Sequence, residues 1–435
     1  MAAPQVHFLN WIAARKTCTV KRLTDRGWTM TELRSAYLAA TLLFLPATSS
    51  ADAVLDWNEL GVAAVLAARQ GAPDGARSVA MMHVAMFNAA NAVEPRYTPY
   101  RFAARASAGA SAEAAVAAAA KAVLVGLFPE QREGLEKAYA SSLQKIADPR
   151  GIQAGAALGE QAGKDCLAMR TGDGVGAVNR YRPVTAPGVY VPTVLPVSYD
   201  WREVKPWVLK QPSQFRPDPP PALKSALWAR DYNEIKELGG KASQKRMPEQ
   251  TEVARFWTAI GVATWNPVVR ALATAKPRTL LDNARLFALV NMAANDAFVA
   301  VFDAKYAFQF WRPVTAIRNG DADGNDATAP DPAWLPLIDT PMHPEYPCAH
   351  CISAGAVAAV LEAEFGTGRV APIAMTSPTA PGVTRRWERI ADYATEVDHA
   401  RIWGGIHYRN STEVGERMGR GIGRLVVASV LRPAQ

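Results

Sequence analysis

The sequence predicts an all-α protein, and three observations support that prediction. Apolar residues recur at three- and four-residue intervals through most of the chain, as they do on one face of a helix. Alternating strand patterns and hairpin dipeptides are nearly absent. Glycine and proline lie between the periodic segments, where helices end. Helices are therefore expected over residues 57–70, 78–94, 111–127, 131–147, 152–169, 222–240, 250–275, 279–310, 348–366, 384–403 and 411–431.

The first five of these segments are rich in alanine, and the chain then changes character. Residues 171–221 contain ten prolines and end in three consecutive ones. Proline lacks an N–H and disrupts a helix interior, so this stretch is expected to be a loop. A structureless loop of this length is unusual inside a compact domain, so it either wraps the surface or joins two halves.

The last three segments each show one apolar side. The segment at 348–366 follows a proline, which is favoured at helix starts. The apolar faces are formed by Val357, Val360, Leu361 and Phe365, by Trp387, Ile390, Ala394 and Val397, and by Val414, Met418, Ile422 and Leu425. The expected architecture is therefore a set of helical bundles with a long proline-rich wrapping loop.

Composition and charge exclude several classes of protein. Of the 435 residues, 49% are hydrophobic and 20% are charged, which argues against a disordered chain or a small disulfide scaffold. No run reaches the roughly 18–20 apolar residues that a membrane-spanning helix needs. The net charge of +8 comes without a dense Lys/Arg run, so nucleic-acid binding is not expected. The oligomeric state stays open.

The amino terminus predicts a secretory signal that begins at an internal methionine. Met30 and Arg34 precede a short apolar run at 36–46, and residues 51–53 (Ala-Asp-Ala) fit a small-x-small cleavage site. The mature protein would then be periplasmic or secreted. The chain would comprise an upstream extension, a signal peptide and a single all-α unit, at residues 1–29, 30–53 and 54–435.

The first of three polar clusters pairs two cations. Lys305 and Arg312 are seven residues apart, which places them on one helical face, two turns apart. Pro313 disfavours helical backbone at Arg312, so the arginine is expected at the helix end. Two neighbouring cations repel each other unless an anion lies between them, although two solvated surface cations would explain the spacing equally well. Asp296 and Asp303 share a helical face and could pair with one of these cations.

The second cluster surrounds a helix start. His343 and His350 flank a proline, after which the N–H groups of residues 348–350 are expected to point outward as an anion site. His350 could donate to or accept from a bound oxygen, although a lone histidine there is more often structural. Cys348 and Cys351 allow a disulfide or two free thiols. A thioredoxin-like or zinc site is less favoured, because neither a preceding strand nor a second ligand pair is evident.

The third cluster lies between the last two helices. Arg401 offers a planar fork suited to an oxyanion, and His407 is a potential metal ligand. Gly404 and Gly405 mark a helix break where backbone can approach a ligand closely. Taken alone, a capped turn with an exposed histidine explains this cluster as well.

In chain order the clusters read Lys-x6-Arg-Pro, then Pro-x-x-His at a helix start, then Arg-x5-His. This tripartite signature resembles the superfamily shared by vanadium-dependent haloperoxidases and type 2 phosphatidic-acid-phosphatase-like acid phosphatases. The resemblance is strong over residues 280–430, and residues 78–95 with the proline-rich middle resemble soluble bacterial haloperoxidase homologues. Chance would have to supply five polar residues in order, so the match is specific.

The resemblance implies helical bundles that hold a tetrahedral oxyanion, vanadate or the competing phosphate, at the end of one bundle. Charge-assisted hydrogen bonds to its oxygens would come from cationic side chains, with Cys348 and the Ala349 N–H as further donors. No haem, flavin or nicotinamide is implied. The implied oxyanion-binding residues are Lys305, Arg312, Cys348, Ala349 and Arg401.

Three histidines receive roles from the resemblance. His407 would bind vanadium axially, or act as the nucleophile of a phosphatase. His350 would be the acid–base group that deprotonates peroxide or protonates a leaving group. His343 lies where haloperoxidases carry an aromatic residue or histidine that bears on halide preference.

Three departures from the family pattern put high activity in doubt. Cys348 replaces a serine and is a poorer hydrogen-bond donor, and Ala349 replaces a glycine. Ser411 stands where the family has an aspartate that orients the imidazole. Losing such a partner lowers affinity or activity by roughly 10–100-fold. Asn410, Ser411 or Glu413 could substitute for it.

The favoured function is vanadate-dependent oxidation of bromide or iodide by hydrogen peroxide, because phosphatases of the superfamily tend to lack a counterpart of His343. The first alternative is a soluble acid phosphatase acting on a small phosphoester. The second is a weakly active or non-catalytic oxyanion-binding homologue, left by the changes at Cys348 and Ser411.

Overall fold

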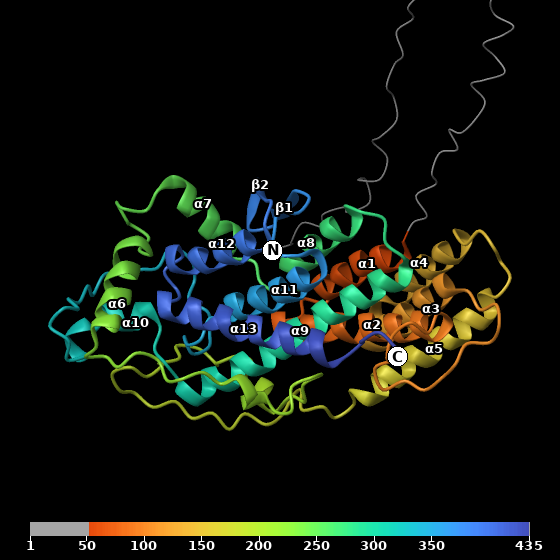
Figure 1. Ribbon diagram of the computed structural model, residues 1–435. Coiled ribbons are helices and arrows are strands. Elements are labelled where there is room, and N and C mark those ends of the chain that lie inside the picture. The colour runs from red at the N-terminus through yellow and green to blue at the C-terminus, as the bar shows by residue number, and fades with distance from the viewer. Residues whose placement is uncertain (1–51, 435) are drawn as a thin grey trace, which may run out of the picture. The chain divides into compact units, whose positions relative to one another are not determined.

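The computed structural model describes residues 52–434 (Figure 1). The predicted upstream extension, and all but the end of the predicted signal peptide, lie outside these residues. Export to the periplasm or medium therefore stays a prediction.

The described residues form thirteen α-helices and one hairpin, which confirms the predicted helical fold. The strands are β1 (Ile373–Ser377) and β2 (Ala380–Trp387). The helices are α1 (Ala53–Ala67), α2 (Ala72–Val93), α3 (Ala112–Leu127), α4 (Arg132–Gln144), α5 (Ile152–Met169), α6 (Ala226–Leu238), α7 (Pro248–Phe256), α8 (Val262–Thr274), α9 (Leu280–Phe308), α10 (Pro313–Arg318), α11 (Ala349–Phe365), α12 (Ile390–Trp403) and α13 (Arg409–Ser429).

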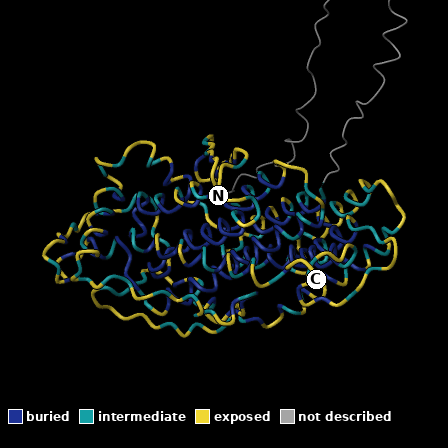
Figure 2. Tube along the Cα trace, viewed as in Figure 1, coloured by how far each residue is buried: buried dark blue, intermediate teal, exposed yellow. Residues whose placement is uncertain are grey.

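Helix α9 is the central helix of the fold and packs against helices from both halves of the chain. It contacts α2 from the first half of the chain and α11 and α13 from the second half (Figure 1). By length and composition α9 could cross a membrane, but its apolar window is entirely buried within the fold. Figure 2 shows the buried residues concentrated along these central helices. The apolar character of α9 therefore reflects its position in the core.

Helices α11 and α13 approach each other closely because small residues line their contact. A Cβ at Gly419 would collide with the carbonyl of Ile352, and a Cβ at Gly423 would collide with the carbonyl of Ala356. Where the two helices begin, the Cys348 N–H donates to the carbonyl of Ser411 (3.2 Å). This packing holds the second and third clusters of the sequence against each other.

The proline-rich segment, residues 171–221, wraps along α9. Asp296 accepts hydrogen bonds from the backbone N–H groups of residues 207–209 at 2.6–3.0 Å. Asp303 accepts two hydrogen bonds of 2.8 Å from the Arg216 guanidinium. The prediction that one of these aspartates pairs with a site cation is therefore wrong. Both anchor the wrapping segment instead.

The structure corrects two predicted helices. The predicted helix over 384–403 begins at Ile390, because the residues before it form strand β2, which pairs antiparallel with β1. The predicted helix over 250–275 is two helices, α7 and α8, separated by a turn at residues 257–261. Gly261 ends this turn with φ +96°, a conformation that glycine adopts without strain.

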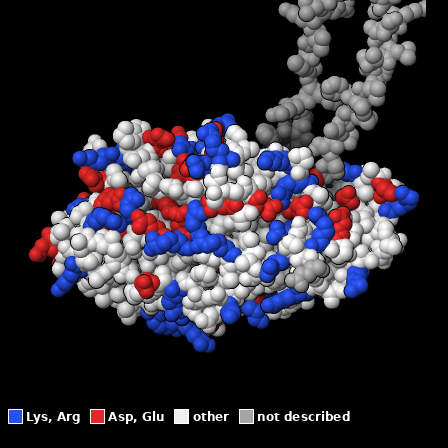
Figure 3. All heavy atoms as spheres, viewed as in Figure 1, with Lys and Arg blue, Asp and Glu red and all other residues white. Residues whose placement is uncertain are grey.

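Surface charges of both signs lie side by side. On the face shown in Figure 3, basic and acidic side chains occupy neighbouring patches. Ion pairs join many of them: Arg420, for example, lies 2.7 Å from both Glu362 and Glu416. These surface charges are therefore balanced locally by their neighbours.

Gly419→Ala should destabilise the protein by at least about 2 kcal/mol, because α11 and α13 would have to separate to admit the methyl group. Urea unfolding followed by circular dichroism would measure the change. Gly134→Ala in α4 is the control, since a Cβ there meets nothing within 4 Å. The control should gain up to about 1 kcal/mol. Equal stability of the two variants would contradict the close packing.

Candidate oxyanion site

Lys305 and Arg312 approach each other by a route that the sequence did not predict. Helix α9 ends at Phe308, and Gln309 after it has a left-handed backbone with φ +52°. Arg312 is the N-cap of α10 and is extended (ψ 153°), as Pro313 requires. The expectation that both cations share a helical face is therefore wrong. The chain turns between them, and burial, followed by the charge of Arg312, lowers the pKa of Lys305 well below its ordinary value.

Backbone carbonyls hold these two cations in place. Lys305 Nζ donates to the carbonyl oxygens of residues 344 and 345 at 2.9 and 2.7 Å. Arg312 donates from Nε to the His343 carbonyl and from Nη1 to the Ile406 carbonyl, both at 2.9 Å. The three clusters predicted from the sequence therefore meet at one place.

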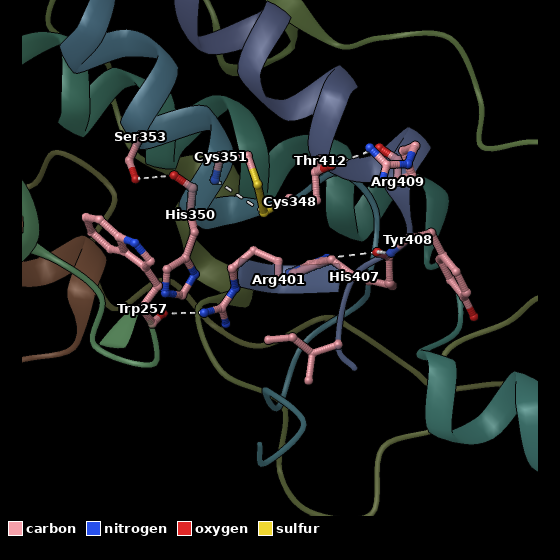
Figure 4. The surroundings of a disulfide bond; sticks show 12 residues. Trp257, Cys348, His350, Cys351, Ser353, Arg401, His407, Tyr408, Arg409 and Thr412 are labelled. Atoms are coloured by element: carbon pink, nitrogen blue, oxygen red, sulfur yellow. Dashed lines mark hydrogen bonds and ion pairs between the residues drawn. A yellow bond between two sulfur atoms is a disulfide. The ribbon is translucent and has the colours of Figure 1, made fainter. Parts of the chain in front are cut away.

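Arg401 completes the set of cations, and the turn between α7 and α8 positions it. Its Nη1 donates to the Trp257 carbonyl in that turn, and the Ala259 carbonyl of the same turn lies 3.2 Å from His350 Nε2. Figure 4 shows the Arg401 guanidinium beside the His350 ring. Arg401 Nε is buried and has no hydrogen-bond partner among the described residues. A bound acceptor oxygen would satisfy it.

The site carries more positive than negative charge in a buried environment. Lys305, Arg312 and Arg401 are 0–2% exposed. Burial and the charge of Arg312 lower the pKa of Arg401 to about 9, and burial lowers the pKa of Arg312 to about 10. The carboxylate that faces Lys305 and Arg312 is Glu345. Arginine stays protonated at neutral pH, so an oxyanion is the natural counter-charge.

The three predicted histidines lie in the same site and are neutral at pH 7. Burial, followed by the charges of the neighbouring cations, lowers the pKa of His343, His350 and His407 well below the ordinary value. A neutral imidazole keeps one nitrogen lone pair. Each ring can therefore act as a base, and His407 can act as a metal ligand.

Glu345 is a functional residue that the sequence analysis missed. Its Oε1 accepts hydrogen bonds from His407 Nδ1 (2.8 Å) and from the Tyr408 N–H (3.1 Å). Arg312 Nη1 can only donate and lies 3.4 Å from His407 Nε2, which assigns the unprotonated nitrogen to Nε2 and the proton to Nδ1. Burial raises the pKa of Glu345 to about 7, although Lys305 and Arg312 counteract the rise.

The carboxylate that orients His407 therefore comes from the second cluster. The expectation that Asn410, Ser411 or Glu413 would fill this role is corrected. The signal for Glu345 in the sequence is an acidic residue in the run His-Pro-Glu-Tyr-Pro, where a charge among apolar neighbours requires a buried partner.

A small cavity lies behind Glu345. The oxygens Glu345 Oε2, Tyr408 Oη and Ser411 Oγ are buried and have no hydrogen-bond partner among the described residues. All three residues line one cavity of about 10 Å³. A cavity of this size has room for one water molecule at most. Ser411 therefore contributes to the surroundings of Glu345 rather than to the imidazole.

Cys348 and Cys351 form a disulfide at the start of α11 (Figure 4). The implied role of Cys348 as a donor to the oxyanion is therefore wrong for this state: its sulfur has no proton, and its N–H is bonded to Ser411. Ala349, the first residue of the helix, keeps an N–H that no intrahelical carbonyl accepts. This N–H can serve an anion as predicted.

Comparison with known proteins agrees with the geometry. Residues 285–435 match the family model of the second helical-bundle domain of VCPO. This part of the chain belongs to that domain family. The predicted membership of the vanadium haloperoxidase superfamily is thereby confirmed.

The related proteins are similar over different extents. Vanadium chloroperoxidase from Curvularia inaequalis is 32% identical over 193 residues, which is 37% of this chain and 31% of that protein. The match therefore spans about a third of the length of this curated relative. A bacterial vanadium-dependent iodoperoxidase structure covers 89% of this chain and 98% of its own, with a TM-score of 0.75 and 23% identity. The structure of an apo bacterial vanadium-dependent chloroperoxidase covers 82% of this chain and 92% of its own, with a TM-score of 0.67 and 17% identity.

An oxyanion should stabilise the folded protein, because it neutralises the buried cations. Phosphate at about 100 times its Kd should add about 2.7 kcal/mol to the unfolding free energy, measured by thermal unfolding in phosphate-free buffer. Arg401→Gln should remove most of this gain. Arg409→Gln is the control, since Arg409 pairs with Glu234 near the surface. If neither phosphate nor vanadate raises the unfolding temperature of the wild-type protein, the oxyanion site is refuted.

Glu345→Gln should weaken vanadate binding relative to phosphate binding, by roughly 10-fold or more. The reason is that vanadate would use the His407 lone pair that Glu345 orients, whereas phosphate relies on charge and hydrogen bonds. Calorimetric titration with each anion gives the ratio of the two affinities. Ser411→Ala should leave that ratio unchanged, and a parallel loss of both affinities in Glu345→Gln would contradict the orienting role.

Proposed function

We propose that this protein is a vanadate-dependent haloperoxidase that oxidises bromide or iodide with hydrogen peroxide. One observation carries the proposal: three buried cations surround a neutral His407 whose Nδ1 is held by Glu345 and whose Nε2 is unprotonated. This is a site for a tetrahedral oxyanion with one additional nitrogen ligand. The relatives named as vanadium chloroperoxidase and iodoperoxidase support the assignment.

The residues of the chain fit vanadate in charge and chemistry. Lys305, Arg312 and Arg401 would bind its oxygens, with the Ala349 N–H as a further donor. His407 Nε2 would be the ligand to vanadium. When bound, vanadate supplies a Lewis acid that activates peroxide toward attack by halide.

His350 is placed to move a proton at the edge of this site. A proton on its Nε2 is donated to the Ala259 carbonyl (3.2 Å), which leaves Nδ1 as the acceptor. The neighbouring Arg401 and burial keep the ring neutral. His350 can therefore take a proton from peroxide as peroxide enters, which is general base catalysis.

His343 is the residue that we associate with halide preference. Arg312 Nη2 lies 3.0 Å from its Nδ1, and Phe302 packs edge-on against its ring. The ring is 9% exposed, the highest value among the site's histidines. A fixed imidazole at this edge would favour bromide or iodide, the more easily oxidised halides.

Phosphoester hydrolysis is the second candidate function. The pairing of Glu345 with His407 also prepares Nε2 as a nucleophile, with His350 as the acid–base group.

We further propose that the protein is exported, because a disulfide persists in oxidising compartments.

The deciding experiment uses the full chain, purified without phosphate and titrated with vanadate. Oxidation of iodide and bromide should require both vanadate and peroxide, and added phosphate should compete. His407→Ala should lose at least about 100-fold of this activity, since it removes the vanadium ligand. His399→Ala is the control, because His399 stacks on Trp403 and contacts none of the site groups.

The other outcomes distinguish the alternatives. Phosphoester hydrolysis that vanadate inhibits, without halide oxidation, would establish the phosphatase. Vanadate binding without either activity would establish a non-catalytic homologue.

A further inference from the structure

The disulfide between Cys348 and Cys351 encloses two residues of the proposed site. Between the bonded cysteines lie Ala349, whose N–H is the proposed anion donor, and His350, the proposed base. Figure 4 shows the disulfide next to His350 and Arg401. The bond therefore fixes the first turn of α11, from which both groups project.

The disulfide is buried and lies in a closely packed turn. Both cysteines are 0% exposed. A Cβ built on Gly415 of α13 would lie 2.8 Å from the Cys348 carbonyl and 3.2 Å from Cys351 Cβ, so α13 packs directly on this turn. Unbonded sulfurs need a separation of about 3.5–4 Å, compared with about 2 Å when bonded. Breaking the bond therefore requires the two sulfurs, or the turn that carries them, to shift within this packing.

The two sulfurs differ in their local environment. Cys348 is the N-cap of α11, and its Sγ accepts a hydrogen bond from the Cys351 N–H (3.2 Å). A helix N-terminus stabilises a thiolate, so Cys348 is the more nucleophilic of the two when reduced. Cys351, one turn further along, is in position to resolve an oxidised Cys348. The remaining cysteine of the described chain, Cys166, is buried elsewhere and donates to the Met81 carbonyl.

We propose that Cys348 and Cys351 form a peroxide-sensitive dithiol that switches the affinity of the site for its oxyanion. The inference rests on the proposed function, because hydrogen peroxide is the substrate that reaches this site. The oxidised form holds Ala349 and His350 in the binding arrangement, and the reduced form releases them.

The oxidation is balanced with hydrogen peroxide alone. The Cys348 thiolate attacks one peroxide oxygen, the O–O bond breaks, and the leaving hydroxide takes the thiol proton to form water. The product is a sulfenic acid at Cys348. The Cys351 sulfur then attacks this sulfur, and a second water leaves as the disulfide forms. Two thiols are oxidised, and one peroxide is reduced to two waters.

The test compares phosphate affinity in the two redox states of the full chain. The protein is reduced with dithiothreitol, freed of reductant under argon and titrated calorimetrically with phosphate. It is then treated with one equivalent of hydrogen peroxide and titrated again. Reduction should weaken phosphate binding by roughly 10-fold or more, and peroxide should restore it. Thiol counts in denaturant should be four after reduction and two after peroxide, given the four cysteines of the chain.

Two variants serve as controls. Cys348→Ser/Cys351→Ser should show a single phosphate affinity that neither reagent changes. Cys166→Ser should keep the full redox response.

The outcomes separate this inference from the proposed function. Equal phosphate affinity in both redox states, with the thiol counts changing as expected, would overturn the switch and leave the anion site intact. Four thiols after peroxide treatment would also overturn it. Absence of phosphate and vanadate binding in both states would instead refute the anion site on which the proposal rests.

Discussion

The burial of three like charges in one small volume is the constraint on which the rest of this structure depends. Lys305, Arg312 and Arg401 repel one another and have lost most of their hydration. The fold offsets this cost with backbone carbonyls, aimed at the cations from the 343–345 segment, the turn after α7 and the end of the α12–α13 connection. The carbonyl oxygens of irregular segments therefore partly balance the buried positive charges, while regular helices hold those segments in place.

Glu345 shows how one residue can serve several needs of such a site. Its side chain orients His407, its carbonyl accepts from Lys305, and its N–H donates to Phe310 (2.9 Å). A carboxylate in the second cluster thus performs a task that the family pattern assigns to the third. A site can keep its geometry when the position of a supporting carboxylate changes, provided that the same imidazole nitrogen still donates its hydrogen bond to a carboxylate.

The sequence predicted those parts of the structure that depend on local signals. Helical periodicity located most of the helices, and the spacing of cations and histidines predicted that three clusters would meet. The partnership of Glu345 with His407 spans 62 residues, so no local pattern reports it. The turn at 257–261 is similar: its carbonyls matter to Arg401 and His350 only through tertiary packing. The hairpin before α12 was missed because its two strands are short and partly exposed.

The wrapping segment has a consequence for how this fold can diversify. It is attached to α9 by a few side chains, and its backbone pairs with residues 309–311 and 342, immediately beside Arg312 and His343. Trp201, Val204, Trp207 and Leu209 anchor its second half in the core, whereas residues 178–198 are mostly exposed or half-buried. Surface loops tolerate changes in length at low energetic cost. Residues 178–198 can therefore change in sequence or length beside Arg312 and His343, while the helices that hold the charges stay as they are. In this architecture, the segment beside the site and the helices that carry the site residues can vary independently of each other.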